Sequence, residues 1–232
     1  MSEELWVTHL GRVGYDEALH LQESLRALRQ RDEIPDVLLC LEHPPTYTLG
    51  RRSDARADLP MGEDWYRGQG FEIVRVDRGG KLTYHGPGQL VGYPIMATHD
   101  VVAFVRTMET ALVRALEDEG IRSRVRTEEG ADFTGVWVED RKIASIGVHV
   151  QRGVTTHGFA VNVENDLQPF EWVVPCGLSG VRMTSVTKEL GSGGVECFRK
   201  RAAYRFPQTH GRRQRIVPAS RLLSLVEPAV PA

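Results

Sequence analysis

Hydrophobic positions along the chain recur at two spacings, which predict helices in some segments and strands in others. At residues 15–31, apolar side chains recur every three or four positions (Ala18, Leu21, Leu25, Leu28) after an acidic start, which predicts an amphipathic helix. A second long helix is expected over residues 101–119, where Gly120 is placed to end it. Shorter helices are expected at residues 184–191 and 195–206.

Short apolar or alternating runs predict strands between and after these helices. These runs occupy residues 37–41, 71–76, 90–95, 121–126, 133–138, 141–150 and 154–163. The connections between the last three runs are two or three residues long, so these strands should be antiparallel neighbours. Because strands and helices do not alternate strictly, the pattern favours one α+β domain built on a largely antiparallel sheet. We place this domain at residues 1–206 and a basic, proline-containing tail at residues 207–232.

Composition narrows the class of protein. The chain has 232 residues, of which 41% are hydrophobic and 26% charged, as in ordinary globular proteins. We find no apolar run long enough for a membrane span and no secretory signal at the start, so we expect a cytoplasmic protein. The three cysteines (Cys40, Cys176, Cys197) form no CxxC pair, and the eight histidines show no metal-binding spacing. We therefore expect neither a disulfide framework nor a metal site.

Charge is distributed unevenly along the chain. Residues 198–226 contain no Asp or Glu but eight Lys or Arg residues, although the whole chain has a net charge of −2. A stretch of this kind is either a solvated terminal segment or a surface that docks an acidic partner.

A glycine-rich segment lies between two predicted strands at residues 78–89. Glycines let a backbone approach a ligand closely and present its N–H groups, but an ordinary turn with an exposed histidine has the same pattern. The segment is not a P-loop, because no Ser or Thr follows Gly80-Lys81 and the four-residue spacer is missing. It is not a dinucleotide fingerprint either, because Pro87 and a strand follow it.

Lys142 begins a strand whose alternate residues, from Ala144 to Val150, are mostly apolar. In one interpretation it lies beside the turn, where it reaches water or pairs with Asp140. In the other interpretation it is a partly desolvated amine that carries a proton.

Cys176 ends an apolar run and is framed by Pro175 and Gly177, so it is expected in a loop. Most free cysteines are inert core residues, and Cys40 and Cys197 fit that description better. A lysine ammonium nearby would lower the pKa of the Cys176 thiol from about 8.5 and make much of it thiolate at neutral pH. Cys176 and Lys142 together therefore suggest acyl transfer through a thioester, without a nucleotide.

Several ordered motifs closely resemble the lipoyl(octanoyl) transferases. They are residues 78–95, Lys142–Gly147 and Pro175-Cys176-Gly177, with further matches at 42–51, 157–163 and 181–186. The resemblance covers roughly residues 5–192. It implies the α/β fold of biotin and lipoate protein ligases, with a mostly antiparallel sheet flanked by helices.

The resemblance also implies an activity, with no cofactor. A member of this family moves octanoate from octanoyl-acyl carrier protein to a lysine of lipoyl domains, in 2-oxoacid dehydrogenases and in glycine cleavage H protein, as the first step of lipoate biosynthesis. It needs neither nucleic acid nor membrane. The family implies Cys176 as nucleophile and Lys142 as the residue that lowers its pKa and shuttles protons. The implied substrate-binding residues are Arg78, Gly79, Gly80, Lys81, Leu82, Thr83, Tyr84, His85, Ser145, Ile146, Gly147, Gly158, Phe159 and Ala160.

Three other functions remain open at this point. A lipoate or biotin ligase would activate a free acid with ATP. A thioesterase or amidotransferase would keep Cys176 but deliver the acyl group elsewhere. A non-catalytic adaptor for carrier proteins would tolerate loss of Cys176.

Overall fold

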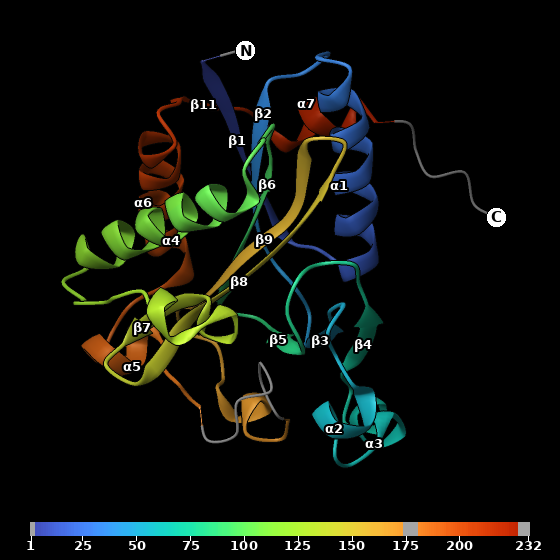
Figure 1. Ribbon diagram of the computed structural model, residues 1–232, viewed down its shortest axis with the longest axis vertical. Helices are drawn as coiled ribbons and strands as arrows, with labels where there is room; N and C mark the ends of the chain where they lie inside the picture. The colour runs from blue at the N-terminus through green and yellow to red at the C-terminus, as the bar shows by residue number, and fades with distance from the viewer. Residues whose placement is uncertain (1–2, 174–180, 227–232) are drawn as a thin grey trace.

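The computed structural model describes residues 3–173 and 181–226, which form one main sheet, a smaller sheet and flanking helices (Figure 1). The main sheet has the strand order β10-β8-β9-β6-β2-β1-β11, and β7 pairs with β8 beside this path. Its strands are β1 (Glu4–Arg12), β2 (Asp36–Glu42), β6 (Gln89–Ile95), β7 (Gly135–Val138), β8 (Arg141–Gln151), β9 (Val154–Asn162), β10 (Arg182–Met183) and β11 (Arg213–Ile216).

The centre of the main sheet is antiparallel, as the sequence predicts. The hairpins β7–β8 and β8–β9 and the pairs β9–β6 and β6–β2 all run antiparallel. Parallel pairs lie toward the two ends of the sheet, where β1 joins β2 and β11, and β10 joins β8. The predicted α+β class with a largely antiparallel sheet is therefore confirmed.

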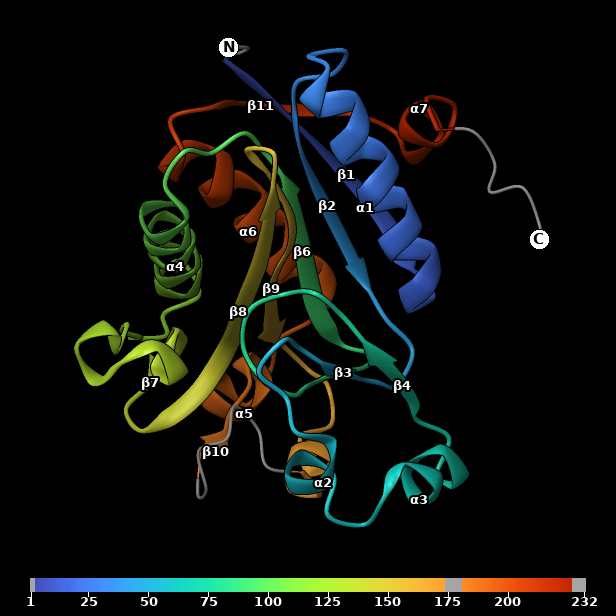
Figure 2. The same cartoon turned by 45° about the vertical axis from the view of Figure 1, so that its right-hand side comes forward.

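Helices cover both faces of this sheet. Helix α1 (Tyr15–Gln30) and the short α7 (Ala219–Leu223) lie on one face, and α4 (Val101–Glu117) and α6 (Val195–Thr209) lie on the other (Figures 1 and 2). Strand β2 is a continuous apolar run because both of its faces are buried. Leu38 and Cys40 pack toward α4 and α6, whereas Val37, Leu39 and Leu41 pack toward α1.

The smaller sheet has the order β4-β3-β5 and supports the glycine-rich segment. It consists of β3 (Thr46–Leu49), β4 (Glu72–Arg75) and β5 (Thr83–His85), with α2 (Ala55–Asp58) and α3 (Glu63–Gly68) after β3. An aromatic cluster that includes Tyr47, Tyr66, Phe71 and Tyr84 fills its core. The loop that joins β4 to β5 therefore begins and ends in a firmly packed unit.

Most predicted helices and strands are confirmed, but the strand predicted at residues 121–126 is wrong. Only Arg124 there forms an isolated bridge, to Trp137, and the 3₁₀ helices η1 (Thr127–Glu129) and η2 (Ala131–Phe133) follow. Arg126 lies over the Trp137 ring, 4.5 Å from its centroid, and pairs with Glu129. These side-chain contacts hold the segment as turns. The predicted short helix is α5 (Val186–Leu190), where Ser185 accepts a bond from the Lys188 N–H and Gly191 ends the helix at φ +74°.

The basic stretch after residue 198 is matched by acidic groups. Seven of its eight cations lie within 4 Å of a carboxylate, and Arg221 lies over the Trp6 ring. Two of the pairs reach Glu4 on β1, because β11 lies beside that strand. The stretch therefore fastens part of the 207–232 segment to the body of the protein, and most of its positive charge is paired within the described residues. The boundary at residue 206 stays a prediction.

Candidate active site

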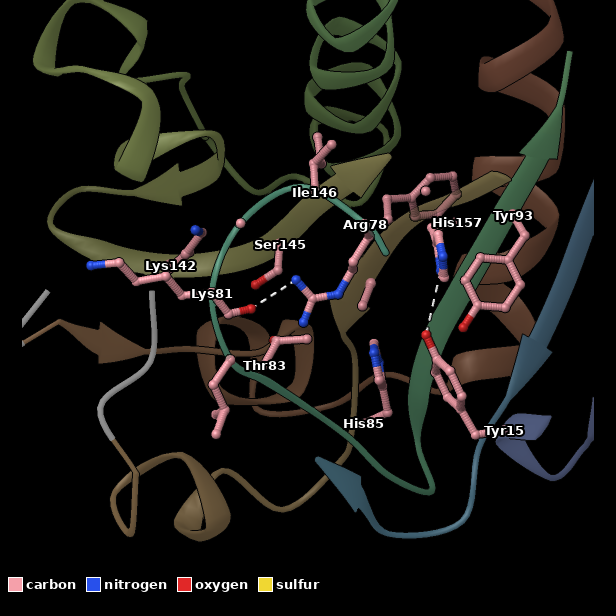
Figure 3. Close-up of a pocket in the computed structure, with 16 residues that line it drawn as sticks. Tyr15, Arg78, Lys81, Thr83, His85, Tyr93, Lys142, Ser145, Ile146 and His157 are labelled. Atoms are coloured by element: carbon pink, nitrogen blue, oxygen red, sulfur yellow. Dashed lines mark hydrogen bonds between the residues drawn. The ribbon is translucent and has the colours of Figure 1, made fainter. Parts of the chain in front are cut away.

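A pocket lies between the glycine-rich loop, the middle of β8 and β9, and the start of α1 (Figure 3). It has about 480 Å³ of space, part of it open to solvent. Within the described residues, its walls are formed by Tyr15, Arg78, Gly80, Lys81, Leu82, Thr83, His85, Tyr93, Lys142, Ser145, Ile146, Gly147, His157, Gly158, Phe159 and Ala160. These residues come from segments that are far apart in the sequence.

Arg78 braces the glycine-rich loop from within. Its guanidinium donates hydrogen bonds to the Lys81 carbonyl (2.8 Å) and the Gly79 carbonyl (3.1 Å) of its own loop. It also donates to the carbonyl and the hydroxyl of Thr48 on β3 (2.9 and 2.7 Å). The residue is only 7% exposed. Arg78 thus lines the pocket, while much of its hydrogen-bonding capacity fixes the shape of the loop.

Glycines let the loop lie directly on the sheet. Gly147 on β8 pairs with Gly158 on β9, and a Cβ at Gly147 would lie 2.7 Å from the Gly79 carbonyl oxygen. A Cβ at Gly158 would lie 2.2 Å from the carbonyl oxygen of Gly92 on β6. Because side chains at these positions would push the layers apart, the glycines set the width of the pocket.

Lys142 is buried at one end of the pocket, with 2% of its surface exposed. Its ammonium lies 5.4 Å from the centroid of the Trp137 ring, and its backbone carbonyl accepts a bond from the Thr184 N–H. Gly135, at φ +134°, leaves room for the side chain, since a Cβ there would lie 2.8 Å from Lys142 Cε. The interpretation in which Lys142 reaches water is wrong, because the side chain is buried, and the carboxylate of Asp140 pairs with Arg182.

The other end of the pocket is formed by what we call the histidine–tyrosine cluster: Tyr15, His43, His85, Tyr93 and His157. His43 does not line the pocket but supports it from behind. Its Nδ1–H donates to the Val13 carbonyl, and its Nε2 accepts a 2.7 Å bond from the Tyr93 hydroxyl. Burial lowers the pKa of His43 to about 4, raises that of Tyr15 to about 12 and raises that of Tyr93 well above its usual value. These three residues are therefore neutral at pH 7.

His157 lies at this end in an unusual backbone conformation, φ +57°, in the middle of β9. Three contacts hold it there. Its N–H donates to Gln22 on α1, its Nε2–H donates to Asp77, and its Nδ1 faces the Tyr15 hydroxyl at 3.4 Å. The bond from His157 lowers the Asp77 pKa to about 2, while burial lowers the pKa of His157 itself.

The structure brings most of the sequence-predicted site residues together. Lys142 and every predicted substrate-binding residue line the pocket except Gly79 and Tyr84. Gly79 donates its N–H to Val148 outside the pocket, and Tyr84 packs in the aromatic cluster of the smaller sheet. Cys176 lies outside the described residues. Tyr15 and Tyr93 are not among the residues that the sequence assigns to the site, and their signal is weak, because each is a single tyrosine within an apolar element. His157 begins the matching segment 157–163, and the sequence leaves it open, with His85 and His149, as a residue that positions the substrate.

No group of three or more His, Cys, Asp or Glu residues suited to a metal ion occurs in the described ranges. A search of the same ranges for a helix long and apolar enough to cross a membrane finds none.

The chain belongs to the lipoyl protein ligase A/B catalytic domain family, whose model matches residues 14–206. Among curated proteins, the octanoyltransferase of Acidobacterium capsulatum is 45% identical over 78% of this chain and 79% of its own. That of Acidothermus cellulolyticus is 47% identical over 79% of this chain and 81% of its own.

Solved structures with the same fold are protein ligases. A lipoate-protein ligase A bound with ATP has a TM-score of 0.76 at 19% identity, covering 97% of this chain and 92% of that one. A putative lipoate protein ligase from T. acidophilum with bound lipoic acid has a TM-score of 0.75 at 20% identity, covering 97% and 93%. At this identity the likeness shows the fold alone.

Proposed function

We propose that this chain is an octanoyltransferase that moves an octanoyl group from octanoyl-acyl carrier protein to a lysine of a lipoyl domain. The observation that carries the proposal is Lys142: a lysine with 2% of its surface exposed, at the end of a pocket beside a glycine-rich loop. Curated relatives that are 42–48% identical are named octanoyltransferases, which supports the same activity. Lipoyl domains of 2-oxoacid dehydrogenases and the glycine cleavage H protein are the proposed acceptors.

In the proposed first step, Cys176 is the nucleophile and Lys142 favours its thiolate. The thiolate attacks the carbonyl carbon of the octanoyl thioester, a new C–S bond forms, and the carrier leaves as a thiolate that takes up a proton. Ile146, Phe159 and Leu82 give the pocket an apolar lining for the alkyl chain.

In the second step, the neutral amine of the acceptor lysine attacks the acyl-enzyme. A C–N bond forms, the Cys176 thiolate leaves, and the proton released by the amine passes to Lys142 or to water. A thioester is converted into an amide, which is downhill, so the reaction needs no nucleotide.

Intact-protein mass spectrometry tests this function. After mixing with octanoyl carrier protein, the native protein should gain one octanoyl group that hydroxylamine removes. Cys176→Ser should gain none, and Lys142→Ala should be labelled much more slowly. Cys197→Ser is the matched control, because Cys197 is an exposed free cysteine on α6. An adduct that persists in Cys176→Ser would contradict the proposal.

A ligase is the second candidate, because the solved neighbours are ligases and one holds ATP. Incubation of the protein with octanoate and ATP distinguishes the two. An octanoyltransferase releases no pyrophosphate under these conditions, whereas a ligase does. If pyrophosphate is released in proportion to octanoate consumed, the ligase reading replaces the proposal above.

A further inference from the structure

We propose that His85 presents a fixed hydrogen-bond acceptor, Nε2, to the far end of the acyl pocket, and that the enzyme therefore also transfers medium-chain acyl groups that carry a hydroxyl near their far end. The inference rests on the proposed acyl transfer and adds a substrate class to it.

The hydrogen bonds that orient His85 start from two backbone carbonyls, those of Thr184 and Tyr84, which can only accept. Asn162 donates through Nδ2 to the Thr184 carbonyl (3.1 Å), so its Oδ1 faces the other way. Gln89 donates through Nε2 both to that Oδ1 (2.9 Å) and to the Tyr84 carbonyl (3.1 Å). The amide orientation of Gln89 is therefore fixed, and its oxygen Oε1 is left as an acceptor.

Gln89 in turn fixes the tautomer of His85. His85 Nδ1 lies 2.8 Å from Gln89 Oε1, and because this oxygen only accepts, Nδ1 carries the hydrogen. Burial keeps the pKa of His85 well below its usual value, so the ring is neutral. Its Nε2 consequently bears a lone pair. Within the described residues, no donor bonds to this nitrogen.

The nitrogen Nε2 belongs to the edge of the ring that faces the pocket. His85 lines the pocket but Gln89 does not, so the Nδ1 edge is turned away from it. Figure 3 shows the His85 side chain pointing into the pocket between Arg78 and Tyr15. The neighbouring rings of Tyr15 and His43 lie 6.0 and 5.6 Å from it, centroid to centroid, and hold it in place.

The two ends of the pocket give the direction of an acyl chain. Lys142 and Lys81 lie at one end, while Tyr15, Tyr93 and His157 lie at the other (Figure 3). A thioester held near Lys142 directs its alkyl chain past Ile146 and Phe159 toward His85. An alkyl group cannot donate to Nε2, whereas a hydroxyl at the right carbon can. A buried hydroxyl is costly without a partner, and His85 supplies that partner.

The experiment compares octanoyl carrier protein with carrier proteins whose octanoyl chain bears a hydroxyl on the sixth, seventh or eighth carbon. For each enzyme variant, kcat/KM for the hydroxylated donor is divided by kcat/KM for octanoyl, with a lipoyl domain as acceptor. In the native enzyme, one hydroxyl position should give a ratio within about threefold of one. In His85→Phe, which keeps a ring but removes the acceptor, that ratio should fall at least about fivefold.

The matched control is His43→Phe. His43 belongs to the same cluster, but both of its ring nitrogens are bonded within the protein and it does not line the pocket. This variant should keep the ratio of the native enzyme. If His85→Phe and His43→Phe change the ratio equally, or if neither does, the role of His85 is refuted even though octanoyl transfer itself continues.

A second measurement covers the case in which His85→Phe does not fold. In ¹⁵N–¹H spectra of the native protein, His85 should be the Nδ1–H tautomer, and its Nε2 resonance should move when the best hydroxylated acyl chain is loaded but not when octanoyl is loaded. An Nε2–H tautomer would overturn the inference. Absence of any octanoyl transfer by the native enzyme would overturn the proposed function and this inference with it.

Discussion

The two ends of the pocket bury titratable side chains of different kinds and in different ways. At the Lys142 end, a basic group is buried beside an indole ring, and the surrounding chain is shaped to make room for it. At the other end, five titratable side chains lie together and are hydrogen-bonded, and burial, the largest cause of each pKa shift, leaves them neutral. We therefore expect the chemistry at the Lys142 end and a structural role for the histidine–tyrosine cluster.

We expect low pH to destabilise the histidine–tyrosine cluster. Burial lowers the pKa of His43 to about 4, so the unfolded chain binds more protons than the folded chain between pH 6.5 and 4. The free energy of unfolding should therefore fall as the pH is lowered through this range, by roughly 3 kcal/mol from His43 alone. Urea denaturation at several pH values measures it.

His43→Gln should make that pH dependence shallower, while His85 and His157 keep part of it. His20, an exposed histidine on α1, provides the control variant His20→Gln. The idea fails if the two variants have the same pH dependence of the free energy of unfolding.

Gly135→Ala should disturb the Lys142 end. The added Cβ would lie 2.3 Å from the Ala144 carbonyl oxygen and 2.8 Å from Lys142 Cε, at a backbone φ of +134° that side chains rarely adopt. We expect octanoyl labelling of the enzyme to slow about tenfold and the free energy of unfolding to fall by about 2 kcal/mol.

Gly130→Ala is the matched control for this change. Gly130 also has a positive φ, +111°, but a Cβ there meets no atom within 4 Å. The control should lose some stability and keep the labelling rate of the native enzyme. Equal slowing in both variants would mean that backbone strain, and not the position of Lys142, is what matters.

Tyr15→Phe should have the smallest effect on stability of these variants, and it tests whether the histidine–tyrosine cluster takes part in the chemistry. It removes the hydroxyl that faces His157 Nδ1 and leaves that nitrogen without a donor among the described residues. The free energy of unfolding should fall by about 1 kcal/mol, whereas the labelling rate of the folded enzyme should change less than twofold. Tyr204→Phe, at an exposed position on α6, should change neither quantity. A large loss of labelling in Tyr15→Phe would assign chemistry to the cluster.

Most residues at the Lys142 end of the pocket belong to the set that the sequence assigns to the site, whereas in the histidine–tyrosine cluster only His85 does. The glycine-rich loop and Lys142–Gly147 are contiguous motifs, so each can be recognised from the residue types and spacing within a single stretch of sequence. Tyr15, in contrast, lies on a helix outside these motifs, and Tyr93, although it lies within the motif at residues 78–95, has the pattern of a core residue of its strand. What makes them part of the pocket is a contact between distant segments, which no local spacing contains.

Helix α6 shows the same limit for the fold. Pro207 suggests an end to the helix at residue 206, but the helix continues to Thr209. A proline lacks the N–H that would bond to the carbonyl of Ala203, and the Gln214 side chain from β11 donates to that carbonyl instead (2.9 Å). The partner that permits the longer helix comes from another strand, so the helix alone does not reveal it.

The place of β1 between β2 and β11 has a consequence for the newly made protein. All described residues of the pocket precede residue 161, whereas the strand that covers the outer side of β1 is made at residues 213–216. A nascent chain therefore holds these residues while β1 still exposes a row of unpaired backbone groups, the kind of edge on which chains associate. Release from the ribosome before β11 emerges would leave a protein with its binding residues present and its sheet open to aggregation.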